Sequence, residues 1–97
     1  MKTTGYLNVC TDFKLKNKII IHPNDGYDIE LMNYSYPVTF STVLTPEKEA
    51  FSGEIALSND CKHNTVTIGT AFWQKIGKID KLILSISDDK KTIFIGK

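Results

Sequence analysis

Residues 65–86 read TVTIGTAFWQKIGKIDKLILSI, and the spacing of their apolar residues changes twice. Apolar and polar residues alternate over 65–68, which predicts a strand, and they alternate again over 82–86. Between these runs the apolar residues recur at helical spacing and stop before a glycine: Phe72, Trp73, Ile76 and Gly77. A glycine at that place is typical of a helix C-terminus. The stretch therefore predicts a strand, a short helix and a second strand.

The same alternation recurs along most of the chain. Further strands are expected over 4–10, 18–23, 27–32, 38–43, 53–59 and 92–95, and one or two helical turns over 45–53. The turn residues Asn24-Asp25-Gly26 predict a hairpin of 18–23 with 27–32, and residues 87–91 predict one between the last two strands.

These elements predict a mainly β fold, a β-rich form of α+β. We expect a compact antiparallel sheet or barrel of about eight short strands with one or two short helices. The chain has 97 residues, which fits a single domain over 1–97. Phe72, Trp73 and Ile76 should cap a core formed by Ile19, Ile21, Ile29, Leu31, Phe40, Ile55, Leu57, Ile68, Leu82, Leu84, Ile93 and Ile95.

Two segments of the chain resemble each other. Residues 5–21 contain Gly-Tyr-Leu-Asn-Val, an aspartate and then three isoleucines, while residues 53–68 contain Gly-Glu-Ile-Ala-Leu, an aspartate and then Val-Thr-Ile. Any two hairpins with alternating apolar residues share such a pattern, and we favour that interpretation. A true duplication would instead predict a fold with a pseudo-twofold axis.

Composition limits the classes of partner. Twelve lysines balance eleven acidic residues to a net charge of +1, so no global field draws the chain to nucleic acid or to a membrane. The chain has no arginine, the usual reader of guanine and phosphate. A chain rich in Lys, Ile and Asn but free of Arg fits AT-rich codons, which indicates a bacterial, phage or plasmid genome.

The sequence shows no apolar run of membrane-spanning length and no apolar core of a signal peptide. We therefore expect a cytoplasmic protein, in a host cell if the gene belongs to a phage. Cys10 and Cys61 are then expected to be free thiols.

Four residues are strong ligands for a soft metal ion: Cys10, His22, Cys61 and His63. Their spacing does not match zinc knuckles, so we expect no metal. Cys61 stands near His63 and beside Asp60, yet the stretch lacks a nucleophile elbow and a glycine-rich oxyanion turn. We therefore expect no enzyme and no cofactor, with a solvated turn at 60–64.

Three lysines alternate in sequence and would project to one side of an extended backbone: Lys14, Lys16 and Lys18. Such a stripe could bind phosphates or an acidic protein surface. Outward lysines also protect the edge of a sheet, which is the interpretation we favour. Asp28 and Glu30 share one face of the predicted strand 27–32, which we interpret as a solvated face.

Tyr34 and Tyr36 flank Ser35 in a predicted loop. Exposed loop tyrosines are typical of protein recognition. Packing of the two rings back onto the sheet is an equal alternative.

Residues 53–97 resemble the AbrB/MazE/SpoVT family of swapped-hairpin DNA-binding proteins. The resemblance rests on residues 65–77, 80–86 and 91–95, which follow the family's order of strand, short helix ending in an apolar residue and Gly, and two strands around an acidic turn. It implies a homodimer whose hairpins interleave into one barrel. It also implies DNA contacts from three basic residues, Lys62, His63 and Lys75. Gly69 and Trp73 depart from the family, which has Pro and a basic residue there.

Two function classes follow. The first is a small non-enzymatic binding protein of phage or mobile-element type that acts on another protein or complex as an inhibitor or accessory factor. The near-neutral charge, the absence of Arg and the missing catalytic set favour it. The second is an AbrB-like transcription regulator or antitoxin that binds DNA as a dimer.

Overall fold

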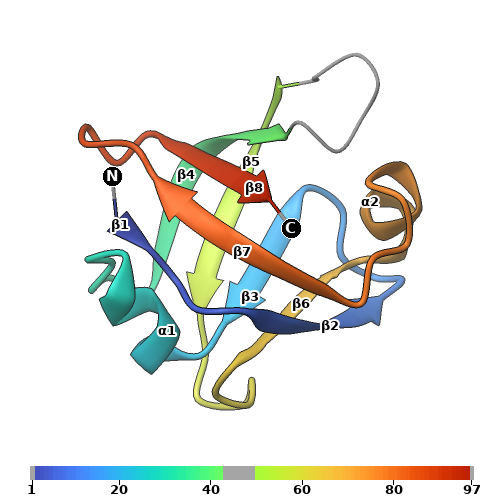
Figure 1. The fold of residues 1–97 in the computed structure, drawn as a ribbon, viewed down its shortest axis with the longest axis horizontal. Helices are drawn as coiled ribbons and strands as arrows, with labels where there is room; N and C mark the ends of the chain where they lie inside the picture. The colour runs from blue at the N-terminus through green and yellow to red at the C-terminus, as the bar shows by residue number, and fades with distance from the viewer. Residues whose placement is uncertain (1, 43–49, 97) are drawn as a thin grey trace.

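The computed structural model describes residues 2–42 and 50–96 (Figure 1). Its elements are β1 (Lys2–Thr3), β2 (Leu7–Asp12), β3 (Lys18–Ile21), α1 (Pro23–Asp28), β4 (Ser35–Thr42), β5 (Ala50–Leu57), β6 (Thr65–Gly69), α2 (Thr70–Lys75), β7 (Lys81–Ile86) and β8 (Thr92–Gly96). The predicted mainly β fold with short strands and two short helices is confirmed. Within these described ranges, neither helix has the length and apolar character that crossing a bilayer requires.

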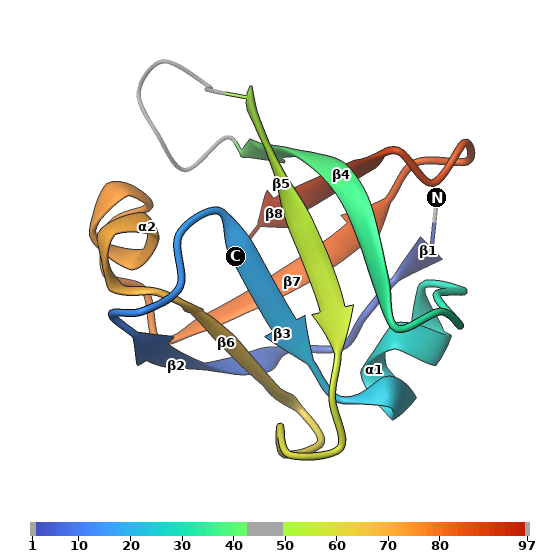
Figure 2. The same ribbon diagram turned by 180° about the vertical axis from the view of Figure 1, so that it is seen from behind.

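The strands form one closed sheet. Their order is β1-β7-β2-β6-β3-β5-β4-β8, and β8 pairs with β7 to close a barrel (Figure 1, Figure 2). Antiparallel pairs join β7 to β1, β2 and β8, join β3 to β6, and join β4 to β5. Parallel pairs join β2 to β6, β3 to β5 and β4 to β8. Alternation along a strand does not encode its neighbours, so the parallel pairs could not be predicted from the sequence.

The interior of the barrel holds the predicted core. All twelve strand-core residues are buried, and Leu7, Val38, Val66 and Ile86 join them. Helix α2 packs on β6 and β2, and the ring of Phe72 meets the ring of Phe40 edge-on at 5.9 Å between centroids. Ile76 is also buried, whereas Trp73 is half-buried against the core. The predicted cap is therefore confirmed, with Trp73 at its rim.

The predicted hairpin of 18–23 with 27–32 is wrong, because α1 occupies residues Pro23–Asp28. Pro23 takes the first helical position, where its missing N–H costs nothing. The Nδ1 atom of His22 accepts a hydrogen bond from the Asn24 N–H at 3.0 Å and caps the helix. Gly26 lets the helix approach β5, since a Cβ there would lie 2.5 Å from the Leu57 side chain. The residues Asn24, Asp25 and Gly26, which predict a turn, therefore lie in the first turns of a helix.

The predicted helical turns over 45–53 lie in part outside the described residues. Residues 45–49 are not described, and residues 50–53 belong to strand β5 instead of a helix.

The predicted hairpin turn at 87–91 is confirmed. The hydroxyl of Ser87 donates to Asp89 Oδ1 at 2.6 Å, and the Lys91 N–H donates to the same oxygen at 3.0 Å. These hydrogen bonds, that of Ser87 foremost, lower the pKa of Asp89. The Asp89 carboxylate therefore stabilises the backbone of the turn.

The strand pairings follow a pseudo-twofold relation. One half of the barrel consists of β2, β3, α1 and β4, and the other half consists of β5, β6, α2 and β7 in the same order. The parallel pair β2–β6 corresponds to the parallel pair β5–β3. The antiparallel pair β2–β7 corresponds to the antiparallel pair β5–β4. Both helices have six residues, and each ends at a buried isoleucine followed by a residue of positive φ: Ile29 and Glu30, Ile76 and Gly77. The topology favours a duplication over a chance likeness of two hairpins.

Candidate binding surface at helix α1

Large apolar side chains gather on the outside of the barrel around α1. Tyr27, Met32 and Tyr34 are 70%, 75% and 84% exposed. With Pro23 and Tyr36 they form what we call the α1 surface. Exposed apolar side chains that lie together mark interaction sites more often than scattered ones do.

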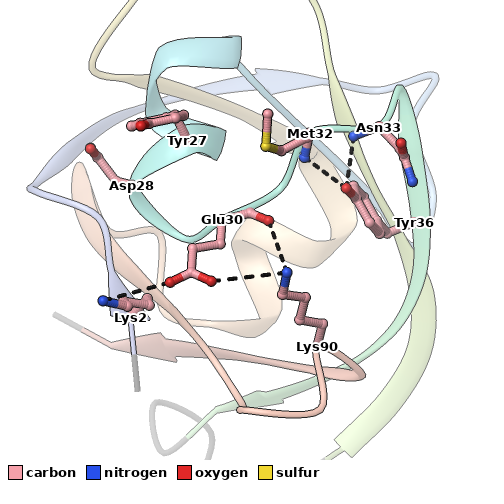
Figure 3. A pocket seen from close by; sticks show the side chains of 8 residues that line it. All are labelled: Lys2, Tyr27, Asp28, Glu30, Met32, Asn33, Tyr36 and Lys90. Carbon is pink, nitrogen blue, oxygen red and sulfur yellow. Dashed lines mark hydrogen bonds and ion pairs between the residues drawn. The ribbon is translucent and has the colours of Figure 1, made fainter.

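Two adjoining pockets hollow the α1 surface. The larger, of about 680 Å³, is lined by Lys2, Tyr27, Asp28, Glu30, Met32, Asn33, Tyr36 and Lys90 (Figure 3). The smaller, of about 200 Å³, is lined by Pro23, Met32, Asn33, Tyr34, Leu57, Ser58 and Asn59. Because Met32 and Asn33 line both, the two pockets form one continuous depression.

Tyr36 fixes the loop that forms this depression. Its hydroxyl oxygen accepts hydrogen bonds from the N–H groups of Met32 and Asn33, each at 2.7 Å (Figure 3). The two contacts hold the loop between α1 and β4 in one shape, so the Met32 side chain is presented outward without a covering partner. A preformed shape lowers the entropy cost of binding.

Charged groups line the rim of the larger pocket. Glu30 Oε1 lies 3.6 Å from Lys2 Nζ, and Glu30 Oε2 lies 4.0 Å from Lys90 Nζ. Lys90 Nζ also donates to the Glu30 carbonyl at 3.3 Å. The Asp28 carboxylate is exposed and has no ion pair or side-chain hydrogen bond within residues 2–42 and 50–96.

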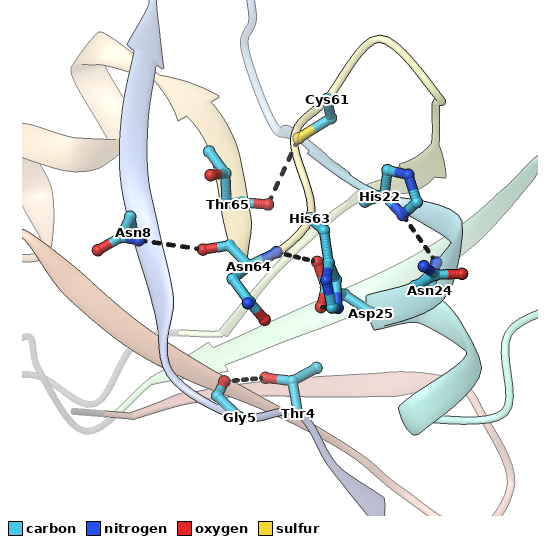
Figure 4. Close-up of polar contacts among 10 residues, drawn as sticks. All are labelled: Thr4, Gly5, Asn8, His22, Asn24, Asp25, Cys61, His63, Asn64 and Thr65. Atoms are coloured by element: carbon cyan, nitrogen blue, oxygen red, sulfur yellow. Dashed lines mark hydrogen bonds and ion pairs between the residues drawn. The ribbon is translucent and has the colours of Figure 1, made fainter.

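The base of α1 is fastened to the turn between β5 and β6. Asp25, which is 1% exposed, accepts a hydrogen bond from the Asn64 N–H at 2.9 Å through Oδ2 (Figure 4). Its Oδ1 lies 3.2 Å from His63 Nε2, and the His63 ring lies 5.7 Å from the His22 ring between centroids. Both carboxylate oxygens of this buried acid are thus engaged in holding the helix in place.

The four candidate soft-metal ligands differ in exposure and in their neighbours. His22 and His63 lie close together, whereas Cys10 is exposed on β2 and Cys61 is buried. Across the described part of the chain, no three His, Cys, Asp or Glu side chains are grouped as metal ligands would be.

The candidate nucleophile Cys61 points at backbone carbonyls. Its Sγ lies 3.4 Å from the Thr65 oxygen and 3.6 Å from the Ile20 oxygen, and burial raises the pKa of the thiol (Figure 4). His63 has Asp25 as its carboxylate neighbour. The arrangement keeps the thiol protonated and does not activate it.

The lysine stripe does not follow a strand. Lys14 and Lys16 lie in the loop between β2 and β3, and Lys18 begins β3 with its Nζ 3.4 Å from Glu54 Oε1. Strand β3 pairs with β5 on one side and β6 on the other, so the edge-protection interpretation is wrong. Asp28 and Glu30 are both exposed, as a solvated face predicts, but they lie at the rim of the pocket because 27–32 is not a strand.

The three basic positions implied by the family resemblance lie apart. Lys62 and His63 precede strand β6, and Lys75 ends helix α2 beyond the other end of that strand. Five strand residues separate the two ends by roughly 16 Å.

Of the predicted site residues, Tyr34 and Tyr36 fall on the α1 surface. Tyr34 is exposed before β4, whereas Tyr36 lies in strand β4 and not in a loop, and its ring packs in part against the core. Sequence reasoning missed Tyr27 and Met32, because in the predicted strand 27–32 Tyr27 shares a face with Ile29 and Leu31, and Met32 shares the opposite face, which we interpret as solvated. The signal that could have found them is Pro23 after His22, which begins a helix and turns Tyr27 outward.

A comparison of the chain with protein-family models, curated proteins and solved structures finds no match.

Proposed function

We propose that the protein is a small non-enzymatic binding protein of phage or mobile-element type that acts in the host cytoplasm. It engages another protein or protein complex, as an inhibitor or accessory factor, through the α1 surface. The observation that carries the proposal is the exposure of Tyr27, Met32 and Tyr34 around one preformed depression.

The pseudo-twofold relation provides an internal comparison. Helix α2 has the same length and the same place in its half of the barrel as α1, and its fifth residue is Gln74 where α1 has Tyr27. A polar residue therefore satisfies the fold at this position, and a 70% exposed tyrosine contributes little to folding. The aromatic side chain supports a role in recognition.

The composition of the α1 surface matches that of protein interfaces. Tyrosine and methionine are enriched at interface centres, and charged groups of both signs form the rim. Here three tyrosines and Met32 line the depression, with Lys2, Asp28, Glu30 and Lys90 at its edge. Rings that pack into a partner's pockets are typical binding hot spots.

The state of the polar groups supports a non-catalytic role. Asp25 is engaged by Asn64 and His63, and the Cys61 thiol is buried against carbonyl oxygens. A nucleophilic thiol needs an adjacent base or a lowered pKa. The Cys61 thiol instead has a raised pKa, and it contacts carbonyl and hydroxyl oxygens.

Capture from host lysate with matched variants tests the proposal. The α1 variant combines Tyr27→Gln, Met32→Gln and Tyr34→Ser, and the control combines Tyr6→Ser and Phe13→Ser, two exposed rings that line neither pocket. Circular dichroism verifies that both variants fold. We expect one host protein to be retained by the native chain and the control but not by the α1 variant. Equal retention by all three, or by none, would overturn the proposal.

The second candidate is an AbrB-like regulator or antitoxin that binds DNA as a dimer. The observation in its favour is the order β6, α2, β7, β8, which agrees with the order that the resemblance implies. The separation of Lys62 and Lys75 disfavours a single basic face.

Salt dependence of DNA binding separates the candidates. A regulator that contacts phosphates through lysines binds duplex DNA at about 50 mM salt and loses most of its affinity at about 200 mM. Fluorescence anisotropy measures both. We expect no change of anisotropy at either concentration, and a steep salt-dependent signal would favour the regulator.

A further inference from the structure

We propose that the larger pocket at α1 receives a basic side chain of the partner, best an arginine, between Tyr27 and Asp28. This inference rests on the proposed function and names the chemistry of its partner. The pocket holds two acids and two lysines, and their pairing decides which charge it can accept.

Glu30 is already occupied. Lys2 and Lys90 both direct their ammonium groups at its carboxylate, and Lys90 also bonds its carbonyl. The two ammonium groups approach Glu30 from opposite sides (Figure 3). Both carboxylate oxygens of Glu30 therefore already have a lysine partner, and Glu30 is not the group that would bind a cation of the partner protein.

The Asp28 carboxylate, in contrast, has no ion pair among the described residues. It also makes no hydrogen bond in the described parts of the chain, and Figure 3 draws it beside Tyr27, apart from the contacts of Glu30. A partner that covers the pocket would leave a desolvated, unpaired carboxylate unless it supplies a cation. A guanidinium satisfies a carboxylate with two parallel hydrogen bonds.

Tyr27 adds the second element of such a site. It adjoins Asp28 in the last turn of α1, and its ring is 70% exposed. An aromatic face attracts a cation, and the planar guanidinium stacks on it better than a lysine ammonium does. At the same two positions helix α2 has Gln74 and Lys75, which lack both features. The fold therefore does not require this pair.

The test is a titration of the full ¹⁵N-labelled chain, followed by amide chemical shifts, with three small probes. Nα-acetyl-arginine methylamide is the cation, the citrulline analogue is its neutral isostere, and Nα-acetyl-glutamate methylamide is the anion. We expect the arginine probe to shift amides of residues 27–32 with a dissociation constant on the order of 1–10 mM. The citrulline and glutamate probes should leave these amides unmoved.

Matched variants sharpen the result. Asp28→Asn should weaken binding of the arginine probe at least about fivefold, whereas Asp80→Asn, the same charge change ahead of β7, should leave it unchanged. Equal shifts with arginine and citrulline, stronger binding of the glutamate probe, or no effect of Asp28→Asn would overturn the inference. If the α1 variant loses its host protein in the capture experiment while no probe binds, the proposed function stands and this inference fails.

Discussion

Glu30 has a φ of 61°, a conformation that an L side chain adopts at a cost of roughly 1–2 kcal/mol. The equivalent position after α2 is Gly77, with a φ of 96°. Glycine takes this conformation without a steric penalty. The Glu30 side chain holds Lys2 and Lys90 at the rim of the pocket, contacts that a glycine could not make.

Replacement of Glu30 by glycine should therefore stabilise the fold. We expect Glu30→Gly to raise the free energy of unfolding by about 0.5–1 kcal/mol, because relief of the backbone exceeds the loss of two exposed ion pairs. Urea denaturation measures the change. The reciprocal Gly77→Glu should lower stability by about 1 kcal/mol, and a destabilised Glu30→Gly would show that the ion pairs dominate.

Trp73 joins helix α2 to the segment before β7. It is half-buried against the core, and its Nε1 donates to the Ile79 carbonyl at 2.9 Å. We expect Trp73→Ala to cost about 2–3 kcal/mol, since packing and one hydrogen bond are lost together. Trp73→Phe keeps most of the packing and should cost about 1 kcal/mol. Thermal melting checks both, and an unchanged Tm of Trp73→Ala would contradict this account.

At the scale of elements, close backbone approaches position the strands. A Cβ on Gly53 of β5 would lie 2.2 Å from the Asn17 carbonyl oxygen and 2.5 Å from the Phe40 ring. The same Asn17 oxygen accepts a hydrogen bond from the Glu54 N–H at 2.9 Å. The loop before β3 and the strand β5 therefore meet at a point where only glycine fits.

Gly53→Ala should lower the free energy of unfolding by about 2–3 kcal/mol, because backbone and an enclosed ring must both move. Gly96→Ala is the matched control in strand β8, where an added Cβ meets nothing within 4 Å. It should change stability by less than about 0.5 kcal/mol. Chemical denaturation of both variants tests the comparison, and similar midpoints would contradict the close approach.

Element prediction from the sequence succeeded where one periodicity dominates. Strand β6, helix α2 and strand β7 follow their apolar spacing, and Gly77 ends the helix where it was expected. It failed at α1, because Asn24-Asp25-Gly26 is favourable in a turn and acceptable in a first helical turn after proline. The wrong strand prediction for 27–32 also concealed the candidate site, because in a strand Tyr27 would share the face of Ile29.

At the scale of the whole molecule, the barrel closes within one chain. Strands β2, β3 and β4 of the N-terminal half pair with β5, β6, β7 and β8 of the C-terminal half. Strand neighbours and the depression at α1 both arise from this arrangement. Neither is encoded locally, so the sequence alone could not reveal them.

The unfolding transition should therefore be independent of protein concentration. A fold that needs a second chain becomes more stable as concentration rises, whereas a self-contained barrel does not. We expect the same Tm over a hundredfold range of concentration in differential scanning calorimetry. A Tm that climbs steadily with concentration would show that dimerisation completes the fold.

Photo-crosslinking in host lysate tests recognition through the α1 surface most directly. A benzophenone amino acid replaces Tyr34 in one sample and Phe13 in another, two rings that are 84% and 82% exposed. After irradiation, we expect one defined adduct from position 34 and none from position 13. The same adducts from both positions, or none from position 34, would contradict the account.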